Sequence, residues 1–143
     1  MEERFEIFTI LLAKINKAIK KIKARVMEEF DLKISHVSCI YYISVYKSLT
    51  ATELCEICQE DKGAISRAIL ELKEKGFIKN ADENNSRYRA DLELTELGKT
   101  VADRISYNIR LYIGEASKGV DEQDRNIMYD CLSKIAINIE KAL

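Results

Sequence analysis

The amino-acid sequence predicts a mainly α-helical protein with one small β-hairpin. Its 143 residues include no proline and only five glycines, so long helices can run without interruption. Hydrophobic residues make up 47% of the chain and charged residues 33%, which is typical of helices with a real core and a well-solvated surface. The apolar residues repeat at helical spacing along most of the chain and alternate like a strand near residues 88–94.

The first 30 residues are predicted to form one long amphipathic helix. Its apolar stripe is sustained for about three heptads, through Phe5, Phe8, Leu12, Ile15, Ile19, Ile22 and Val26. Cations occupy the remaining surface, namely Lys14, Lys17, Lys20, Lys21, Lys23 and Arg25. Such a stripe packs on its own domain or faces a second subunit, and both alternatives stay open.

Capping residues mark the shorter helices that follow. A second helix is expected over about 35–46. Thr50 and Glu53 form a capping box that begins a third helix. Asp61 is suited to N-cap a fourth helix, which Gly76 ends.

A hairpin is predicted between Phe77 and Leu94. Residues 82–86 form a polar turn, and the alternation from Tyr88 to Leu94 indicates a half-buried second strand. Thr95 then caps a fifth helix, and Asp121 caps a sixth. The predicted order is therefore four helices, a hairpin and two helices.

Two short helices joined by a tight turn and followed by a hairpin define a winged helix-turn-helix, which predicts DNA binding. The fourth helix fits the major groove, because its N-terminal face has small residues around two cations. These residues are Lys62, Gly63, Ala64, Ser66 and Arg67. Small side chains let the backbone approach the bases, and Arg67 is placed to donate two hydrogen bonds to a guanine.

Local charge favours the same segment. Residues 61–89 contain seven Lys and Arg against five Asp and Glu, whereas residues 90–143 contain seven against ten. The net charge of the whole chain, -1, neither supports nor excludes a nucleic-acid partner. A solvated charged helix is the alternative interpretation, and the order of the elements favours DNA.

Three stretches resemble the MarR family of bacterial and archaeal transcription regulators. They are LTATELCEICQEDKGAISRAILELKEKGFI from Leu49 to Ile78, NNSRYRADLELT from Asn84 to Thr95, and LTELG from Leu94 to Gly98. The resemblance covers residues 31–98 in motif detail and the whole chain in helix order. It implies a homodimeric regulator, most often a repressor, that binds a pseudo-palindromic operator in double-stranded DNA and in many members is released by a small ligand.

The resemblance also implies how the chain is divided. Residues 1–30 and 99–143 would form a helical dimerisation region, and residues 31–98 the winged helix-turn-helix. The wing of the family usually has an Asp-x-Arg motif that this chain does not match in register. We therefore expect Arg87, and in second place Arg89, to contact DNA from the wing.

An effector cleft is a further expectation from the resemblance. Effectors of the family bind between the second, first and fifth helices. Tyr41, Tyr42 and Tyr46 lie close together there, and with His36 they would line a cleft for a small aromatic effector. The alternatives are ordinary dimer-core packing for the tyrosines and a surface or capping position for His36.

The four cysteines are predicted to be reduced, buried structural thiols. Cys39, Cys55, Cys58 and Cys131 lie within apolar helical patterns. Cys55-x-x-Cys58 has the spacing of redox and zinc motifs, but no second Cys or His pair lies at zinc-finger spacing. Redox-sensing relatives usually place a reactive cysteine in the first helix, where this chain has none.

The remaining expectations are exclusions. The sequence has no nucleophile–base pair, phosphate-binding glycine loop or HExxH pattern, so no enzyme, metal site or cofactor is expected. The start MEERFEIF does not look like a signal peptide and no apolar run spans a membrane, so a cytoplasmic location is expected. The competing function is a winged-helix module for protein contact that has no operator of its own.

Overall fold

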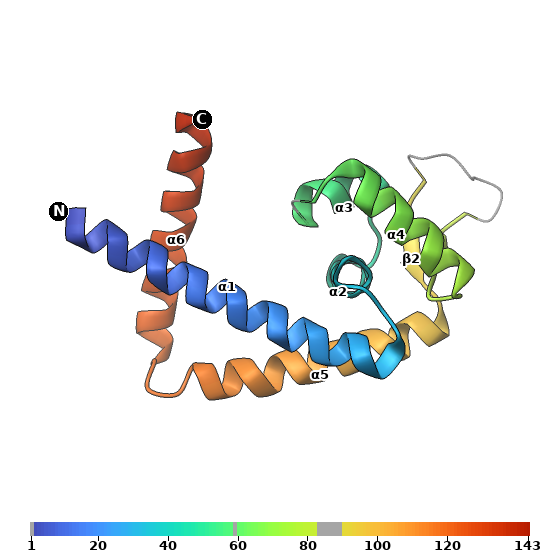
Figure 1. The fold of residues 1–143 in the computed structure, drawn as a ribbon, viewed down its shortest axis with the longest axis horizontal. Helices are drawn as coiled ribbons and strands as arrows, with labels where there is room; N and C mark the ends of the chain where they lie inside the picture. The colour runs from blue at the N-terminus through green and yellow to red at the C-terminus, as the bar shows by residue number, and fades with distance from the viewer. Residues whose placement is uncertain (1, 59, 83–89) are drawn as a thin grey trace. The chain divides into compact units, whose positions relative to one another are not determined.

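The computed structural model describes residues 2–58, 60–82 and 90–143 (Figure 1). The elements in chain order are α1 (Glu2–Phe30), α2 (Ile34–Tyr46), α3 (Ala51–Cys58), α4 (Lys62–Glu74), β1 (Ile78–Asn80), β2 (Leu92–Leu94), α5 (Glu96–Ala116) and α6 (Glu122–Ala142). This order confirms the predicted fold class, a mainly helical chain with a two-stranded hairpin between the fourth and fifth helices.

The chain divides into two compact units, residues 1–109 and residues 110–143, with the boundary inside α5. The first unit contains the helix-turn-helix and the hairpin. The functional division expected from the sequence, with residues 31–98 for DNA and the flanking helices for dimerisation, stays a prediction.

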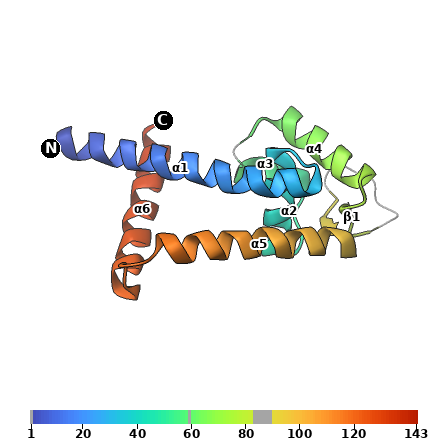
Figure 2. The same cartoon turned by 60° about the horizontal axis from the view of Figure 1, so that its bottom comes forward.

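Helix α2 forms the centre of the first unit. Figure 1 looks nearly along its axis, and Figure 2 shows it from the side, between α1 and the first part of α5. Its Val37, Cys39, Ile40 and Ile43 are at most 1% exposed. The core continues through Leu54, Ile65, Leu72, Val101 and Ile105, which come from α3, α4 and α5. Burial of these apolar side chains is the main force that holds the unit together.

Capping hydrogen bonds are present at the predicted starts of α3 and α4. The Thr50 N–H donates to Glu53 Oε2 at 2.7 Å, and the Glu53 N–H donates to Thr50 Oγ1 at 3.2 Å. Asp61 Oδ1 accepts from the Ala64 N–H at 3.0 Å and so fixes the start of α4. Gly76 follows the end of α4 with φ of 78°, a left-handed conformation that glycine adopts at low cost.

The wing differs from the prediction in two details. Strand β2 begins at Leu92, so the expected strand was wrong at Ala90 and Asp91, although Asp91 O still accepts from the Ala81 N–H at 2.8 Å. Its expected first residues, Tyr88 and Arg89, and residues 83–86 of the expected turn lie outside the residues that the structure describes. Leu49 forms an unpredicted bridge with Leu92, through N–H···O bonds of 2.9 and 3.3 Å. The segment between α2 and α3 therefore contributes to the base of the wing.

Helix α6 buries none of its residues within the chain. Large apolar side chains on it, including Ile127, Met128, Tyr129 and Ile137, are 43–55% exposed. No helix in the described ranges is both long enough and apolar enough to cross a membrane.

Candidate nucleic-acid interface

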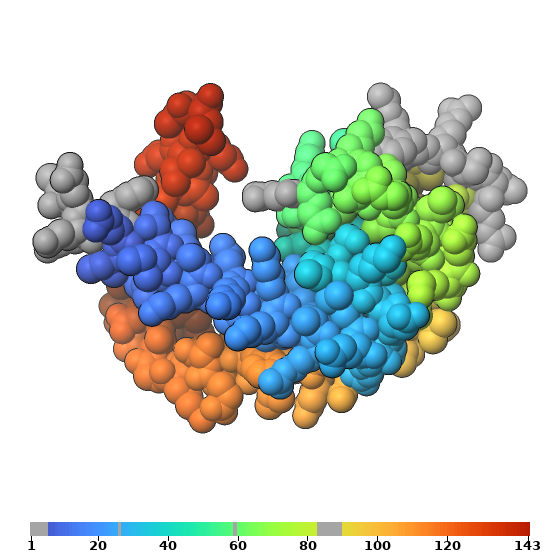
Figure 3. Space-filling model, viewed as in Figure 1, coloured from blue at the N-terminus to red at the C-terminus, as the bar shows by residue number. Residues whose placement is uncertain are grey.

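The buried face of α4 fixes which side chains it exposes. Ile65, Ala68, Ile69 and Leu72 face the core at helical spacing. The N-terminal turn on the other side therefore presents Lys62, Gly63 and Arg67 to solvent, while Ala64 and Ser66 are half-buried. In the space-filling view of Figure 3, α4 (green) lies at the surface of the first unit. The structure thus brings together the five residues predicted for this helix, which we call the recognition turn.

Gly63 lies beside the Arg67 guanidinium group and the Asp61 carboxylate within the recognition turn. A Cβ at Gly63 would lie 3.4 Å from an Arg67 guanidinium nitrogen and 3.0 Å from Asp61 Oδ1. The guanidinium therefore lies back over the first turn, toward the helix N-terminus. Backbone N–H groups and the helix dipole also favour an anion there.

The wing residues predicted to bind DNA, Arg87 and Arg89, lie outside the residues that the structure describes. The described part of the wing places exposed Lys79 on β1. The assignment of DNA contacts to the two arginines therefore stays a prediction from sequence.

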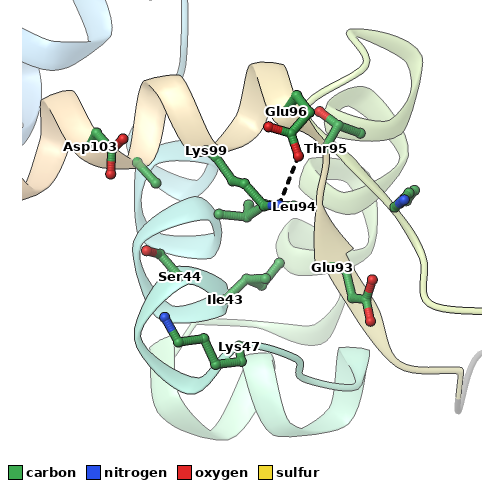
Figure 4. A pocket seen from close by; sticks show the side chains of 11 residues that line it. Ile43, Ser44, Lys47, Glu93, Leu94, Thr95, Glu96, Lys99 and Asp103 are labelled. Carbon is green, nitrogen blue, oxygen red and sulfur yellow. Dashed lines mark hydrogen bonds and ion pairs between the residues drawn. The ribbon is translucent and has the colours of Figure 1, made fainter.

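A pocket of about 560 Å³ lies between the end of α2, the base of the wing and the start of α5 (Figure 4). Three cations and three anions line it: Lys47, Lys79 and Lys99, with Glu93, Glu96 and Asp103. Lys99 Nζ forms an ion pair with Glu96 Oε1 at 2.8 Å. The charges balance, so the pocket has no clear preference for an anion or a cation. None of the residues predicted for the effector cleft line it.

The structure separates the residues predicted to line the effector cleft. Tyr41 and Tyr42 are half-buried against the core, with ring centroids 5.3 Å apart in an edge-to-face contact. Burial raises the pKa of Tyr42. Tyr46, at the end of α2, is 57% exposed. His36 lies at the other end of α2, in a different set of contacts, so the four do not share a described pocket and the cleft stays a prediction.

His36 joins the start of α2 to α4. It is 1% exposed. Its Nδ1 accepts from the Lys33 N–H at 3.1 Å, which is the capping position that the sequence left open, and its Nε2 lies 2.7 Å from Glu71 Oε2. Since Nδ1 accepts, the proton of the neutral ring is on Nε2 and donates to Glu71. Lys33 Nζ completes the cluster at 2.9 Å from Glu71 Oε1.

This geometry predicts an acid-sensitive contribution to stability. Burial lowers the pKa of His36 below 6.5, against the opposing hydrogen bond to Glu71. A depressed pKa in the folded state means that the stabilisation is present above the unfolded pKa and is lost as the pH falls through the folded pKa. Protonation would also point an Nδ1–H at the Lys33 N–H.

We expect the free energy of unfolding to fall more steeply with acid in the wild type than in His36→Gln, by at most about 1.4 kcal/mol per pH unit. Urea denaturation at several pH values between about 7.5 and 5 measures this difference. Parallel pH profiles for the two proteins would show that His36 does not titrate on unfolding in this range.

The cysteines are less uniform than predicted. All four are free, but only Cys39 is buried; Cys55 and Cys58 are half-buried and Cys131 is exposed. The prediction of four buried thiols was therefore wrong for Cys131, because α6 covers none of its residues within this chain. Among the described residues no three His, Cys, Asp or Glu side chains form a group that could bind a metal ion.

Cys55 and Cys58 are packed against the core that contains Cys39 of α2. Their Cys-x-x-Cys spacing therefore places them at the edge of the core of the first unit, and all three thiols are free.

Comparisons with known proteins agree with this fold. No protein-family model matches the chain. An uncharacterised HTH-type transcriptional regulator of Bacillus anthracis is 24% identical over 116 residues, which cover 80% of this chain and 77% of the relative.

Solved structures of the MarR family superpose well on the chain. A putative MarR family regulator of Listeria monocytogenes, complexed with 26mer DNA, is 24% identical with a TM-score of 0.76, over 92% of this chain and 89% of that one. Staphylococcus aureus MarR in complex with salicylate and kanamycin is 14% identical with a TM-score of 0.79, over 96% and 93%. The chain therefore has the winged-helix fold of MarR family regulators, as its motifs predict.

Proposed function

We propose that this protein is a transcription regulator that binds double-stranded DNA through the recognition turn of α4. The observation that carries the proposal is the exposure of Lys62, Gly63 and Arg67 at the Asp61-capped start of α4, within a helix-turn-helix followed by a wing. Support comes from a solved neighbour with the same fold that is complexed with DNA. The competing function, a protein-contact module without an operator, has no comparable support.

The recognition turn suits the major groove. An α-helix fits that groove, and its N-terminal residues meet the base edges. Gly63 and Ala64 have the smallest side chains, so the helix backbone can approach the DNA. Arg67 is long enough to reach a guanine. Lys62 adds a cation for the phosphates, whose neutralisation supplies much of the affinity.

Selection from random duplex DNA tests this proposal. The full chain, immobilised on beads, is given a pool of duplexes with a randomised core, and bound DNA is sequenced after several rounds. We expect one motif to be enriched, arranged as an inverted repeat. If the bound pool stays as random as the input, the protein does not read sequence and the protein-contact alternative is the better account.

The homodimer is part of the proposal and rests on uncovered apolar surface. Large apolar side chains that α1 leaves exposed include Ile7, Ile10, Leu11, Ile15 and Ile19. The second unit adds Leu111, Ile113 and the apolar residues of α6. Monomeric proteins rarely leave apolar surface of this extent in water, whereas a twofold interface would cover it.

We expect light scattering to give a mass of about 33 kDa, twice the 16.4 kDa of the chain, at micromolar concentration. Replacing exposed Ile15 with a charged residue, as Ile15→Glu, places a charge in the apolar stripe of α1 and should shift the mass toward the monomer. Glu56→Lys, which reverses the charge of an exposed residue on α3 outside the apolar surface assigned to the dimer, is the control. A wild-type mass of 16.4 kDa would contradict the dimer.

Three finer points complete the proposal. The protein would act in the cytoplasm, as a repressor at a pseudo-palindromic operator. A small aromatic effector would release it, and Tyr41 and Tyr42, whose rings form an edge-to-face pair, are two of the four residues expected to line its cleft. A neighbour with this fold is complexed with salicylate, an aromatic acid, which supports the same class of ligand.

A further inference from the structure

Leu70 is an exposed apolar residue in the second half of α4. Its side chain is 60% exposed, and among the large apolar residues that the structure describes only the C-terminal Leu143 is more exposed. The other large apolar residues of α4 form its buried face, at 8% exposure or less. A single exposed leucine is common on protein surfaces, so the position of Leu70 on the helix decides what it can contact.

Helical geometry places Leu70 on the centre line of the outer face of α4. Successive residues of an α-helix are turned by about 100°, so residues seven apart lie within about 20° of each other. Leu70 is therefore in line with Gly63, and Arg67 lies beside that line, one turn before Leu70. Long side chains on a helix point back toward its N-terminus, so that of Leu70 lies next to the recognition turn. Leu70 thus extends the surface that the recognition turn begins.

The charged neighbours of Leu70 show where this surface ends. The carboxylate of Glu71 is neutralised within the chain, since it pairs with Lys33 Nζ at 2.9 Å and lies 2.7 Å from His36 Nε2. Glu74, one turn beyond Leu70, is exposed and would repel phosphate. The face of α4 that can enter a groove therefore begins with the two cations of the recognition turn and ends with one apolar side chain.

We propose that Leu70 contacts the C5-methyl group of a thymine and is a specificity-determining residue of the DNA interface. This proposal rests on the DNA binding proposed above. Thymine presents its methyl group in the major groove, where apolar side chains recognise it by contact. Positions 67 and 70 lie about 4.5 Å apart along the helix axis, and successive base pairs are about 3.4 Å apart. Since the Arg67 guanidinium extends back over the first turn, the thymine should lie within about three base pairs of the guanine that Arg67 contacts.

Replacing thymine with uracil tests the contact, because deoxyuridine lacks only the C5-methyl group and keeps the O4 acceptor. Each thymine of the selected duplex is replaced in turn, at the equivalent positions of both half-sites, and affinity is measured by fluorescence anisotropy. At one position we expect the wild type to lose about fourfold in affinity for each half-site, the effect of one buried methyl group, and about fifteenfold in total.

Three variants assign the effect to its side chain. Leu70→Ala should bind the thymine and uracil duplexes equally at that position, because the side chain that meets the methyl group is gone. Leu70→Met keeps an apolar side chain of similar volume and should still prefer thymine. Leu97→Ala is the matched control, since Leu97 is 52% exposed on α5, and it should keep the wild-type preference. Because Leu70 is exposed, Leu70→Ala should unfold at the urea concentration of the wild type.

Two results would overturn the proposal while DNA binding stands. In one, the wild type binds every uracil duplex as tightly as the thymine duplex, or the selected motif contains no thymine. In the other, the preference for thymine survives in Leu70→Ala, or this variant binds selected and random duplexes more weakly by the same factor. The proposed function fails in a different way: selection then enriches no motif, and the assignment of Leu70 falls with it.

Discussion

We expect Gly98→Ala to lower the free energy of unfolding by about 2–3 kcal/mol, because an added methyl group meets closer atoms there than at any other glycine of the chain. Gly98 is buried in the first turn of α5. A Cβ there would lie far inside contact distance of the Phe77 carbonyl oxygen, 3.0 Å from the Phe77 carbonyl carbon and 3.4 Å from Leu94 Cβ. Two of these atoms belong to backbone, which cannot rotate away as a side chain does.

The surrounding contacts show why the backbone cannot yield. The Thr95 N–H donates to Phe77 O at 3.0 Å, and the Thr95 hydroxyl donates to Gly76 O at 2.5 Å. Thr95 Oγ1 in turn accepts from the Gly98 N–H at 3.0 Å. The start of α5 is therefore held against the chain segment that leaves α4, and a methyl group must break this junction.

Gly114→Ala is the matched control, because it makes the same change in the same helix where a Cβ would meet nothing within 4 Å. There the alanine should stabilise the chain by about 0.5–1 kcal/mol, since glycine is a poor helix former. Urea denaturation of the three proteins measures both effects. If Gly98→Ala unfolds within about 0.5 kcal/mol of the wild type, α5 is not held against Phe77 as described.

We expect Arg67→Ala to weaken binding to a selected duplex by about 1–3 kcal/mol for each recognition turn, and by about twice that in a dimer. The reason is the loss of a bidentate contact with a base, so the preference at that base pair should relax while affinity for random DNA changes little. Arg110→Ala, which removes one exposed cation from the second unit, is the control and should bind as the wild type does.

Arg87→Ala should weaken DNA binding in a different way, because the sequence leads us to expect that Arg87 contacts phosphate or the minor groove. Its removal should weaken binding to all duplexes alike. The slope of log affinity against log salt should become shallower by about one for each phosphate that the variant no longer neutralises. Anisotropy with selected and scrambled duplexes across a salt series measures both variants. If the affinity of Arg67→Ala for the selected duplex changes by less than about twofold, α4 does not contact the bases.

The sequence predicted the local features of the fold well because their causes lie within a few residues. The N-cap of α4 is an example, because the Asp61 carboxylate accepts a hydrogen bond from the N–H of Ala64, only three residues later. The recognition turn was predictable for the same reason, since helical spacing decides which residues of α4 face away from the core.

The features that the sequence did not predict join distant segments. Leu49 pairs with Leu92, and His36 bonds to Glu71, 35 residues away. Neither contact produces a periodic pattern, because each depends on one residue from each segment.

The measurement that tests the central claim most directly is the ratio of affinities of the wild-type chain for its selected duplex and for a scrambled duplex of equal length. If the recognition turn of α4 reads base edges, the ratio should be at least about a thousand near physiological salt. It should also depend on salt much less than either affinity does, because phosphate contacts are common to both duplexes. A ratio near one across the salt series would contradict the account, because the protein would then bind DNA by charge alone.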